Sequence, residues 1–242
     1  MKTSALWIVA VILCSLGSAG AQTPYHDDAL HWGLTIPPGW ALRSEQDIKA
    51  LNEEVHRRAP NKNFHFVAGL RVDPEGPAFP YILVQRNEIP LTGATYEDIE
   101  RVFGATDFNK IGREAVKSSV DFIKSADFGK PRLDRATNRI FLDHTMSDAE
   151  GHSLRGVSIM QLTPDGAIQL NFYTLAENFD KEIAKLDPFL ASFKIDPGHE
   201  FVSGRGSRAT AIGVKTGVGV LVGLLVAFVS IMRRKNAKPA QV

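Results

Sequence analysis

The chain has 242 residues, of which 44% are hydrophobic and 23% are charged, a composition that excludes a disordered or fibrous protein and fits one globular domain. Its formal net charge is +1, but all 27 acidic residues and 22 of the 28 basic ones lie between residues 22 and 208. This net acidic region argues against nucleic-acid binding, since nucleic-acid-binding proteins carry a clear basic excess.

Residues 1–21 have the pattern of a secretory signal peptide. An apolar run over residues 5–16 follows a positive start and is too short to cross a bilayer, and residues 19–21 are small, as a cleavage site requires. Cleavage would begin the mature chain near Gln22 and remove Cys14, the single cysteine, which would exclude disulfides and cysteine-ligated metals. An uncleaved anchor helix and a lipoprotein signal at Cys14 are the alternatives.

The first half of the mature chain predicts short strands alternating with helices. Ser44 with Asp47 and Thr95 with Asp98 have the spacing of a capping box, so each pair predicts the start of a helix. Residues 37–39 (PPG) predict a turn. The expected elements, in chain order, are strand 30–36, a short strand from residue 40, helix 44–58, strands 64–72 and 79–89, helix 95–104, and a wider helical pattern over 108–122.

The second half predicts strands 139–146, 154–163 and 167–175, followed by a helix over 179–193. Asp165 and Gly166 predict a tight turn between the last two strands. The apolar residues of the helix recur at spacings of four and three, and Pro188 interrupts it, with Asp187 placed to cap the restart. Adjacent antiparallel strands flanked by helices predict an α+β fold, an antiparallel sheet covered by helices in an αβα sandwich.

The C-terminal part predicts a tether and a membrane anchor. Residues 199–208 have no apolar period and predict the tether. Residues 209–232 are apolar apart from Lys215 and a few small polar residues, and predict one transmembrane helix. A buried core helix is the alternative. Residues 233–242 would then form a short cytoplasmic tail.

Together the two ends predict a single-pass membrane protein of the cell envelope. A cleaved signal would place residues 22–198 outside the cytoplasm, in the periplasm or on the extracellular side, as the folded domain. Small residues at a spacing of four further predict a homodimer through the anchor. These residues are Gly213, Gly217, Gly219 and Gly223.

Two stretches resemble a known family. Residues 30–40 (LHWGLTIPPGW) and residues 166–195 (GAIQLNFYTLAENFDKEIAKLDPFLASFKI) are similar to the first hairpin and the final strand and helix of the PsbP and Mog-type superfamily, which includes bacterial envelope proteins of the DcrB type. The resemblance implies a helix-sheet-helix sandwich. It also implies a binding or assembly role, because the family has no shared catalytic motif, and it transfers no functional residue to this chain.

Two groups of residues are candidates for binding. Trp32 and Trp40 bracket the turn at residues 37–39, either as exposed binding aromatics or packed beneath the turn. A basic cluster follows at the end of the first helix, and it predicts either a docking patch for anionic headgroups or an acidic partner, or cations that complement the helix dipole. The cluster comprises His56, Arg57, Arg58, Lys62 and His65, of which Arg57, Arg58 and Lys62 are the site candidates.

Catalytic and metal-binding residues are weakly indicated. His144 and His152, each near carboxylates, are candidates for a general base if a cleft surrounds them. A cluster near the mature N-terminus could hold a surface metal ion or form an exposed polar lead-in, and it comprises His26, Asp27, Asp28 and His31. The sequence therefore predicts a non-catalytic binding or assembly module for an envelope protein partner, without metal or cofactor, with an envelope enzyme using His144 or His152 as the alternative.

Overall fold

The computed structural model describes residues 22–58, 65–72, 79–88, 90–118, 123–148 and 151–204. The predicted signal peptide, anchor and cytoplasmic tail lie outside these residues, as do Lys62 and the anchor glycines. The strands are β1 (Thr23–Asp27), β2 (Trp32–Ile36), β3 (Trp40–Leu42), β4 (His65–Val72), β5 (Tyr81–Glu88), β6 (Ile123–Phe128), β7 (Arg132–Asp134), β8 (Arg139–Asp148), β9 (Ser153–Thr163), β10 (Gly166–Leu175) and β11 (Lys194–Ile195). The helices are α1 (Glu45–Arg58), α2 (Tyr96–Ala105), α3 (Phe108–Ser118), α4 (Phe179–Glu182) and α5 (Asp187–Ser192), with 3₁₀ turns at Ala176–Asn178 and Ile183–Leu186.

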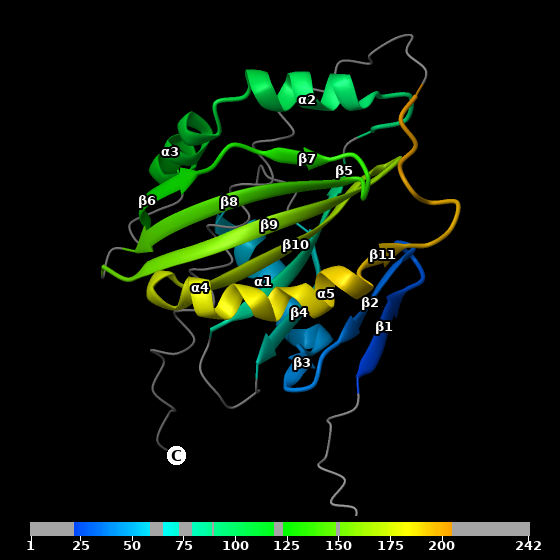
Figure 1. Ribbon diagram of the computed structural model, residues 1–242. Helices are drawn as coiled ribbons and strands as arrows, with labels where there is room; N and C mark the ends of the chain where they lie inside the picture. The colour runs from blue at the N-terminus through cyan, green and yellow to red at the C-terminus, as the bar shows by residue number, and fades with distance from the viewer. Residues whose placement is uncertain are drawn as a thin grey trace, which may run out of the picture.

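The main sheet has eight strands, and all of its paired neighbours are antiparallel. Its order is β3-β4-β5-β10-β9-β8-β6 (Figure 1). β6 pairs with the second half of β8, and β7 pairs with the first half of the same strand. The predicted strands of both halves are confirmed. The tight turn lies one residue earlier than predicted, because Gly166 already pairs with Thr163 and the turn consists of Pro164 and Asp165.

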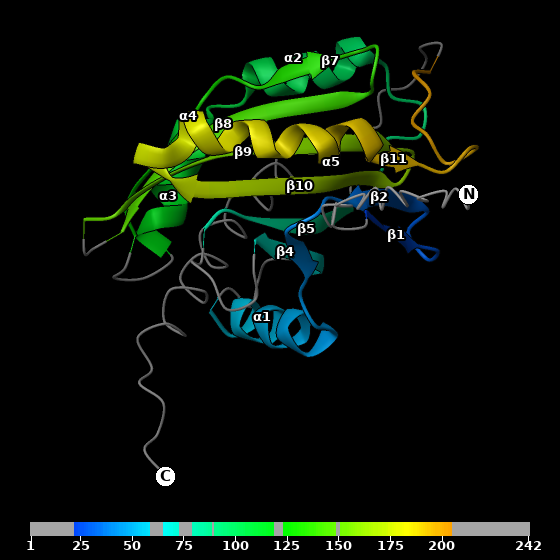
Figure 2. The ribbon, with the colours of Figure 1, turned by 60° about the horizontal axis from the view of Figure 1, so that its bottom comes forward.

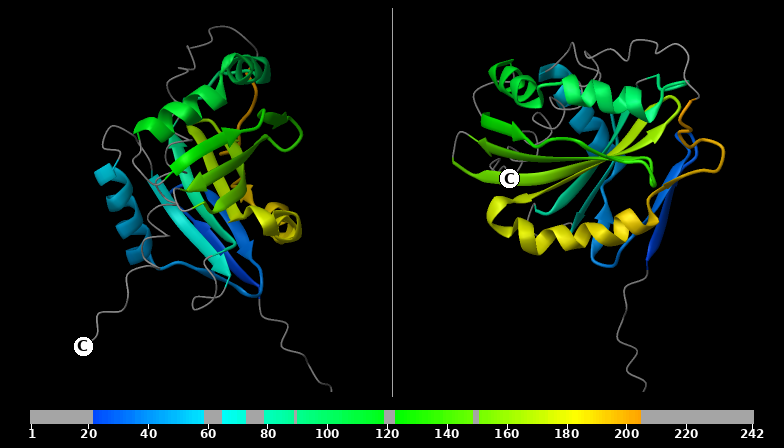
Figure 3. Two further views of the ribbon diagram at one scale, coloured as in Figure 1. Left: turned by 90° about the vertical axis from the view of Figure 1, so that its left-hand side faces the viewer. Right: turned by 45° about the horizontal axis from the view of Figure 1, so that its top comes forward.

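Helices lie on both faces of this sheet, which confirms the α+β class. α1 and α3 pack on the face that carries Leu142, Met146 and Tyr173. α4 and α5 pack on the opposite face, against Leu170 and Phe172. Figures 2 and 3 show α1 and the α4–α5 segment on opposite sides of the strands.

The centre of the sheet carries a chain of amide side chains on its α1 face. The Gln85 amide donates to Asn87 Oδ1 at 2.8 Å, Asn87 donates to Gln169 Oε1 at 2.6 Å, and Gln169 donates to Asn171. Ser158 also donates to Asn171 Oδ1, at 2.8 Å. All five side chains are buried, so these hydrogen bonds offset part of the cost of removing them from water, while Gln85 Oε1 and Asn171 Nδ2 have no partner among the described residues.

The helix starts and the helix interruption follow the predicted patterns with one exception. Ser44 Oγ accepts from the Asp47 backbone N–H, and Thr95 and Asp98 form a reciprocal capping box at α2. The last helical segment is divided by the 3₁₀ turn at Ile183–Leu186, just ahead of the predicted position, and Pro188 lies in the first turn of α5 that follows. Asp187 does not cap that restart, because the capping position is Leu186 and no side chain bonds there.

Four short strands were not predicted. β1 and β11 pair with β2 in a separate three-stranded sheet, so the residues expected as an exposed lead-in are partly in a strand. β6 and β7 both pair with β8. Gly129, between them, donates its N–H to the Asp143 carbonyl at 2.8 Å, which continues the pairing across the gap.

The predicted tether begins too early. Phe201 is 3% exposed and packs in the cluster with Leu91 and Ile99. Ser203 Oγ accepts from the Tyr96 N–H at 3.2 Å, and the Gly204 N–H donates to the Ala94 carbonyl at 2.8 Å. The folded domain therefore extends at least to residue 204, past the boundary expected at 198.

Within the described ranges, no helix is long and apolar enough to cross a membrane. The predicted transmembrane helix over residues 209–232 lies beyond Gly204, the last described residue, and stays a prediction.

Phe201 and Val202 form a matched pair for testing the extended boundary. Phe201→Ala should lower the free energy of unfolding of the full chain by about 3 kcal/mol, because it empties a buried aromatic site. Val202 is 79% exposed, so Val202→Ala should change it by less than about 0.5 kcal/mol. Urea unfolding measures both. Equal small effects would show that residues 199–204 do not pack on the domain.

Candidate binding groove

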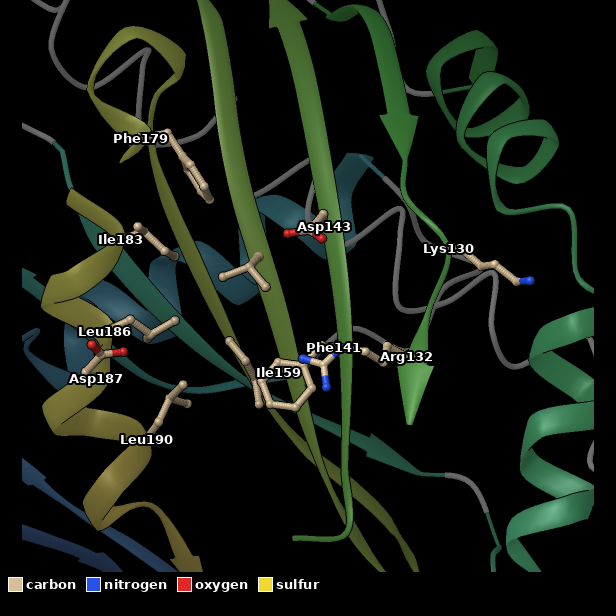
Figure 4. Close-up of a pocket in the computed structure, with 11 residues that line it drawn as sticks. Lys130, Arg132, Phe141, Asp143, Ile159, Phe179, Ile183, Leu186, Asp187 and Leu190 are labelled. Atoms are coloured by element: carbon tan, nitrogen blue, oxygen red, sulfur yellow. The ribbon is translucent and has the colours of Figure 1, made fainter. Parts of the chain in front are cut away.

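A groove of about 400 Å³ lies between the α4–α5 segment and the outer face of the sheet (Figure 4). This volume is within the range of small-molecule and peptide side-chain sites. Its lining residues are Lys130, Arg132, Phe141, Asp143, Val157, Ile159, Phe179, Ile183, Leu186, Asp187 and Leu190.

One wall of the groove is the apolar stripe that the sequence predicts for residues 179–193. Phe179, Leu186 and Phe193 are buried against the sheet, whereas Ile183 and Leu190 are only partly buried. Figure 4 shows the side chains of Ile183 and Leu190 directed toward the groove. The helix that closes the core therefore also leaves apolar surface along one side.

The floor comes from neighbouring positions on β8 and β9. Phe141 is opposite Ile159 and Asp143 is opposite Val157 in the register of the two strands. Ile159 and Val157 are buried and Phe141 is half-buried. The floor is thus apolar at three positions and acidic at the fourth.

Arg139 of β8 holds the wall over the floor. Its guanidinium donates to the Leu190 carbonyl at 3.0 Å and to the Phe193 carbonyl at 2.6 Å, at the end of α5. A third bond runs from Arg139 Nε to Gln161 Oε1 at 2.8 Å. Because a cation at a helix C-terminus is favourable, this contact both stabilises α5 and sets its distance from β8.

Charged side chains form the rim. The Arg132 guanidinium lies 4.4 Å from the centre of the Phe141 ring, a cation–π contact that places its charge at the edge of the floor. Lys130 precedes it on the same side, and Asp187 lies on the helix side. These three residues and Asp143 are exposed, and none of the four is in an ion pair with another described residue.

Trp32 is not an exposed binding aromatic. Its side chain is 0% exposed and packs edge-on against Phe193, with ring centres 5.8 Å apart. Trp40 is half-buried and packs edge-on against Phe189 at 4.9 Å. The packing alternative is therefore correct for Trp32, and Trp40 mainly supports the helix α5.

The predicted basic patch is only partly described. Arg57 is exposed and pairs with Glu54 on the same helix, 2.6 Å apart, and this partner raises the pKa of Arg57. Arg58 is the last residue of α1, and Lys62 lies outside the described residues. A docking patch formed by Arg57, Arg58 and Lys62 stays a prediction.

His144 is a core residue. It is 2% exposed, with its ring 5.1 Å from Tyr173, and burial lowers the pKa of His144 to about 4. Neither His144 nor His152 lines this groove, the pocket beside α1 or the pocket beside His31. A general base must reach its substrate, so this placement argues against the enzyme alternative through His144.

The N-terminal histidines join the two ends of the domain. His26 Nδ1 lies 2.8 Å from Asp28 and His26 Nε2 lies 2.9 Å from Asp196, while the His31 and His199 rings stack with centres 3.6 Å apart. Asp196 and Asp28 raise the pKa of His26. Among the described residues, no group of three or more histidine, cysteine, aspartate or glutamate side chains is arranged to hold a metal ion.

Comparisons with known proteins find similarity to solved structures. No protein-family model and no curated protein matches the chain. The chain is similar to the solution structure of cyanobacterial PsbP (CyanoP) from Synechocystis sp. PCC 6803, with 15% sequence identity and a TM-score of 0.47, over 76% of this chain and 98% of that chain. At this identity and score the function has to be inferred from this chain's own residues.

The buried His144 should make stability depend on pH. The unfolded chain binds a proton at this residue near pH 6.5 and the folded chain only near pH 4, so the free energy of unfolding should fall as pH decreases between these values, by about 3 kcal/mol. His144→Leu should remove this part of the pH dependence, which urea unfolding of both proteins at pH 7.5 and 4 measures. An unchanged difference between the two pH values would show that His144 is accessible to protons in the folded state.

Proposed function

We propose that the chain is a membrane-anchored extracytoplasmic module of the cell envelope that binds or assembles with a protein partner and performs no chemistry itself. The groove beside α4 and α5 carries this proposal. Seven of its eleven lining residues are apolar, and the other four are charged, three at the rim and Asp143 on the floor. No histidine, cysteine or serine lines it. Such a lining supports recognition of a surface and offers no hydroxyl or thiol nucleophile and no imidazole base.

The packing of the C-terminal segment supports a short connection to the proposed anchor. The domain is tied down as far as Gly204, whose N–H bonds to Ala94. Five residue steps from there to residue 209 span roughly 18 Å when fully extended. A domain on so short a connection would stay close to the membrane surface, where an envelope partner is also present.

Single cysteines on either side of the proposed anchor test the topology. Val202 is 79% exposed, so Val202→Cys should react with an impermeant maleimide on intact cells or spheroplasts, whereas Ala240→Cys should be protected. Cys14→Ser in both variants keeps the background silent if the signal is not removed. Labelling at residue 240 with protection at residue 202 would invert the topology and overturn the envelope proposal.

Photo-crosslinking tests the groove. A photoreactive phenylalanine analogue at Ile183, which is partly buried beside the groove, should form a discrete adduct in native membranes that the same analogue at the exposed Val202 does not form. The Ile183 adduct should disappear when Leu190→Glu places a charge in the groove, because the charge would have to be desolvated on binding. Equal adducts at both positions, or an Ile183 adduct that survives Leu190→Glu, would exclude the groove as the binding surface.

A further inference from the structure

The outer face of the main sheet is covered on one side only. α4 and α5 pack against residues of β10 and β9, while β8 and its neighbours β6 and β7 continue the sheet beyond them (Figures 1 and 2). Among the described residues, no second helix lies on this face. The groove is thus the place where a neighbouring helix would pack beside α4–α5 in a complete helix layer.

The wall has the spacing that a helix partner uses. Ile183 and Leu190 are seven residues apart, one heptad, and both are partly buried and directed toward the groove. The wall from Phe179 to Leu190 spans eleven residue steps, roughly 16 Å as helix, which matches about three turns of a partner helix. The floor strand β8 offers no free edge to a partner strand, because it is already paired with β6 and β7 on the side away from β9.

The two sides of the groove rim carry opposite charges. Lys130 and Arg132 make the sheet side basic, and Asp187 makes the helix side acidic. Asp143 adds a carboxylate on the floor, toward the Phe179 end. Since none of these charges is paired within the described structure, opposite charges on an incoming molecule would gain contacts without breaking existing ion pairs.

We infer that the groove docks an amphipathic helix of a partner protein, with an apolar stripe flanked by acidic residues toward Lys130 and Arg132 and by basic residues toward Asp187. This rests on the proposed function and specifies the partner chemistry of the same groove. An apolar stripe fills the floor formed by Phe141, Val157 and Ile159. The flanking charges fix the direction in which the helix lies, which an apolar stripe alone does not.

Two synthetic peptides of identical composition test this inference. Each has three to four helical turns with leucine at heptad spacing. The first carries glutamate along one flank of the leucine stripe and lysine along the other. The second carries the same residues with glutamate and lysine mixed on both flanks, so that neither direction of binding matches both sides of the groove. Fluorescence anisotropy against the full chain in lipid nanodiscs measures affinity. The first peptide should bind roughly fivefold more tightly at low salt, and the difference should shrink in 0.5 M salt.

Variants of the chain make the test specific. Asp187→Lys, which makes both flanks of the groove basic, should abolish the preference for the first peptide while the second peptide still binds, an outcome that general loss of folding cannot produce. Ile183→Glu should weaken both peptides by roughly tenfold, whereas Val202→Glu, at an exposed position outside the groove, should leave both affinities unchanged.

The outcomes separate this inference from the proposed function. Equal affinity for the two peptides, or a preference that persists in Asp187→Lys, overturns the charged-helix partner. If a fluorescent dodecanoate binds to the chain, if this binding is lost in the Ile183→Glu variant, and if neither peptide binds, the occupant is an amphiphilic small molecule. A dimer in sedimentation that Ile183→Glu dissociates identifies a second copy of the chain. In each of these cases a groove-specific crosslink from Ile183 would still support a binding module.

Discussion

The structure depends on burying strand β10 on both of its faces. Nine of its ten residues are buried, so helices or further chain must cover both sides of the sheet at its centre. One face offers Ile168, Leu170 and Phe172 to α4 and α5, which is ordinary apolar packing. The other face brings Gln169 and Asn171 into the interior, where they require partners. The amide chain from Gln85 to Asn171 supplies partners for Gln169 and for Asn171 Oδ1, while Asn171 Nδ2 stays without one. With the Ser158 hydroxyl it links β5, β10 and β9 through side chains as well as backbone.

The groove exists because helices cover the two faces of the sheet to different extents. The α1 face is closed by α1, α2 and α3 around two apolar clusters. The outer face has only the short α4–α5 segment, and Arg139 fastens the end of that segment to β8 at a fixed distance. The strip of β8 and β9 beside it stays apolar at Phe141 and Ile159, because these positions alternate with the inward-facing Leu142 and Met160. An apolar strip beside a fixed helix is a groove.

The sequence predicted those elements whose residues carry a period. Strand β8 alternates between its two faces from Ile140 to Met146, and β10 alternates apolar and polar residues from Ile168 to Phe172. Since α2 also has both a capping box and an apolar face, the α+β class was accessible. β1 (TPYHD), β7 (RLD) and β11 (KI) are too short or too polar for any alternation to show. They exist because a neighbouring strand already presents unpaired backbone groups, and this is a tertiary effect that local pattern does not contain.

The sequence predicted one of the two walls of the candidate site. The spacing of Phe179, Ile183 and Leu190 gave one wall, but the opposite wall comes from Lys130 and Arg132, about fifty residues earlier in the chain. Residues 129–132 carry no motif, and they reach the groove because β6 and β7 both pair with β8. Trp32 shows the converse limit. An aromatic beside a turn is compatible with binding or packing, and only the position of Phe193 decides for packing.

The chain is packed on the domain without interruption from α5, the wall of the groove, to Gly204, the last described residue. α5 ends at Ser192 and leads directly into β11, which pairs with β2, and Asp196 then contacts His26 of β1. The following residues are held by the His31–His199 stack and by the bond from Gly204 to Ala94. No free linker therefore separates the groove from residue 204. In the proposed arrangement the orientation of the groove toward the membrane is set by the domain itself, and only the few residues before the anchor can change it. A partner helix that is itself held near the membrane would meet the groove in a restricted range of orientations, which reduces the entropy lost on binding.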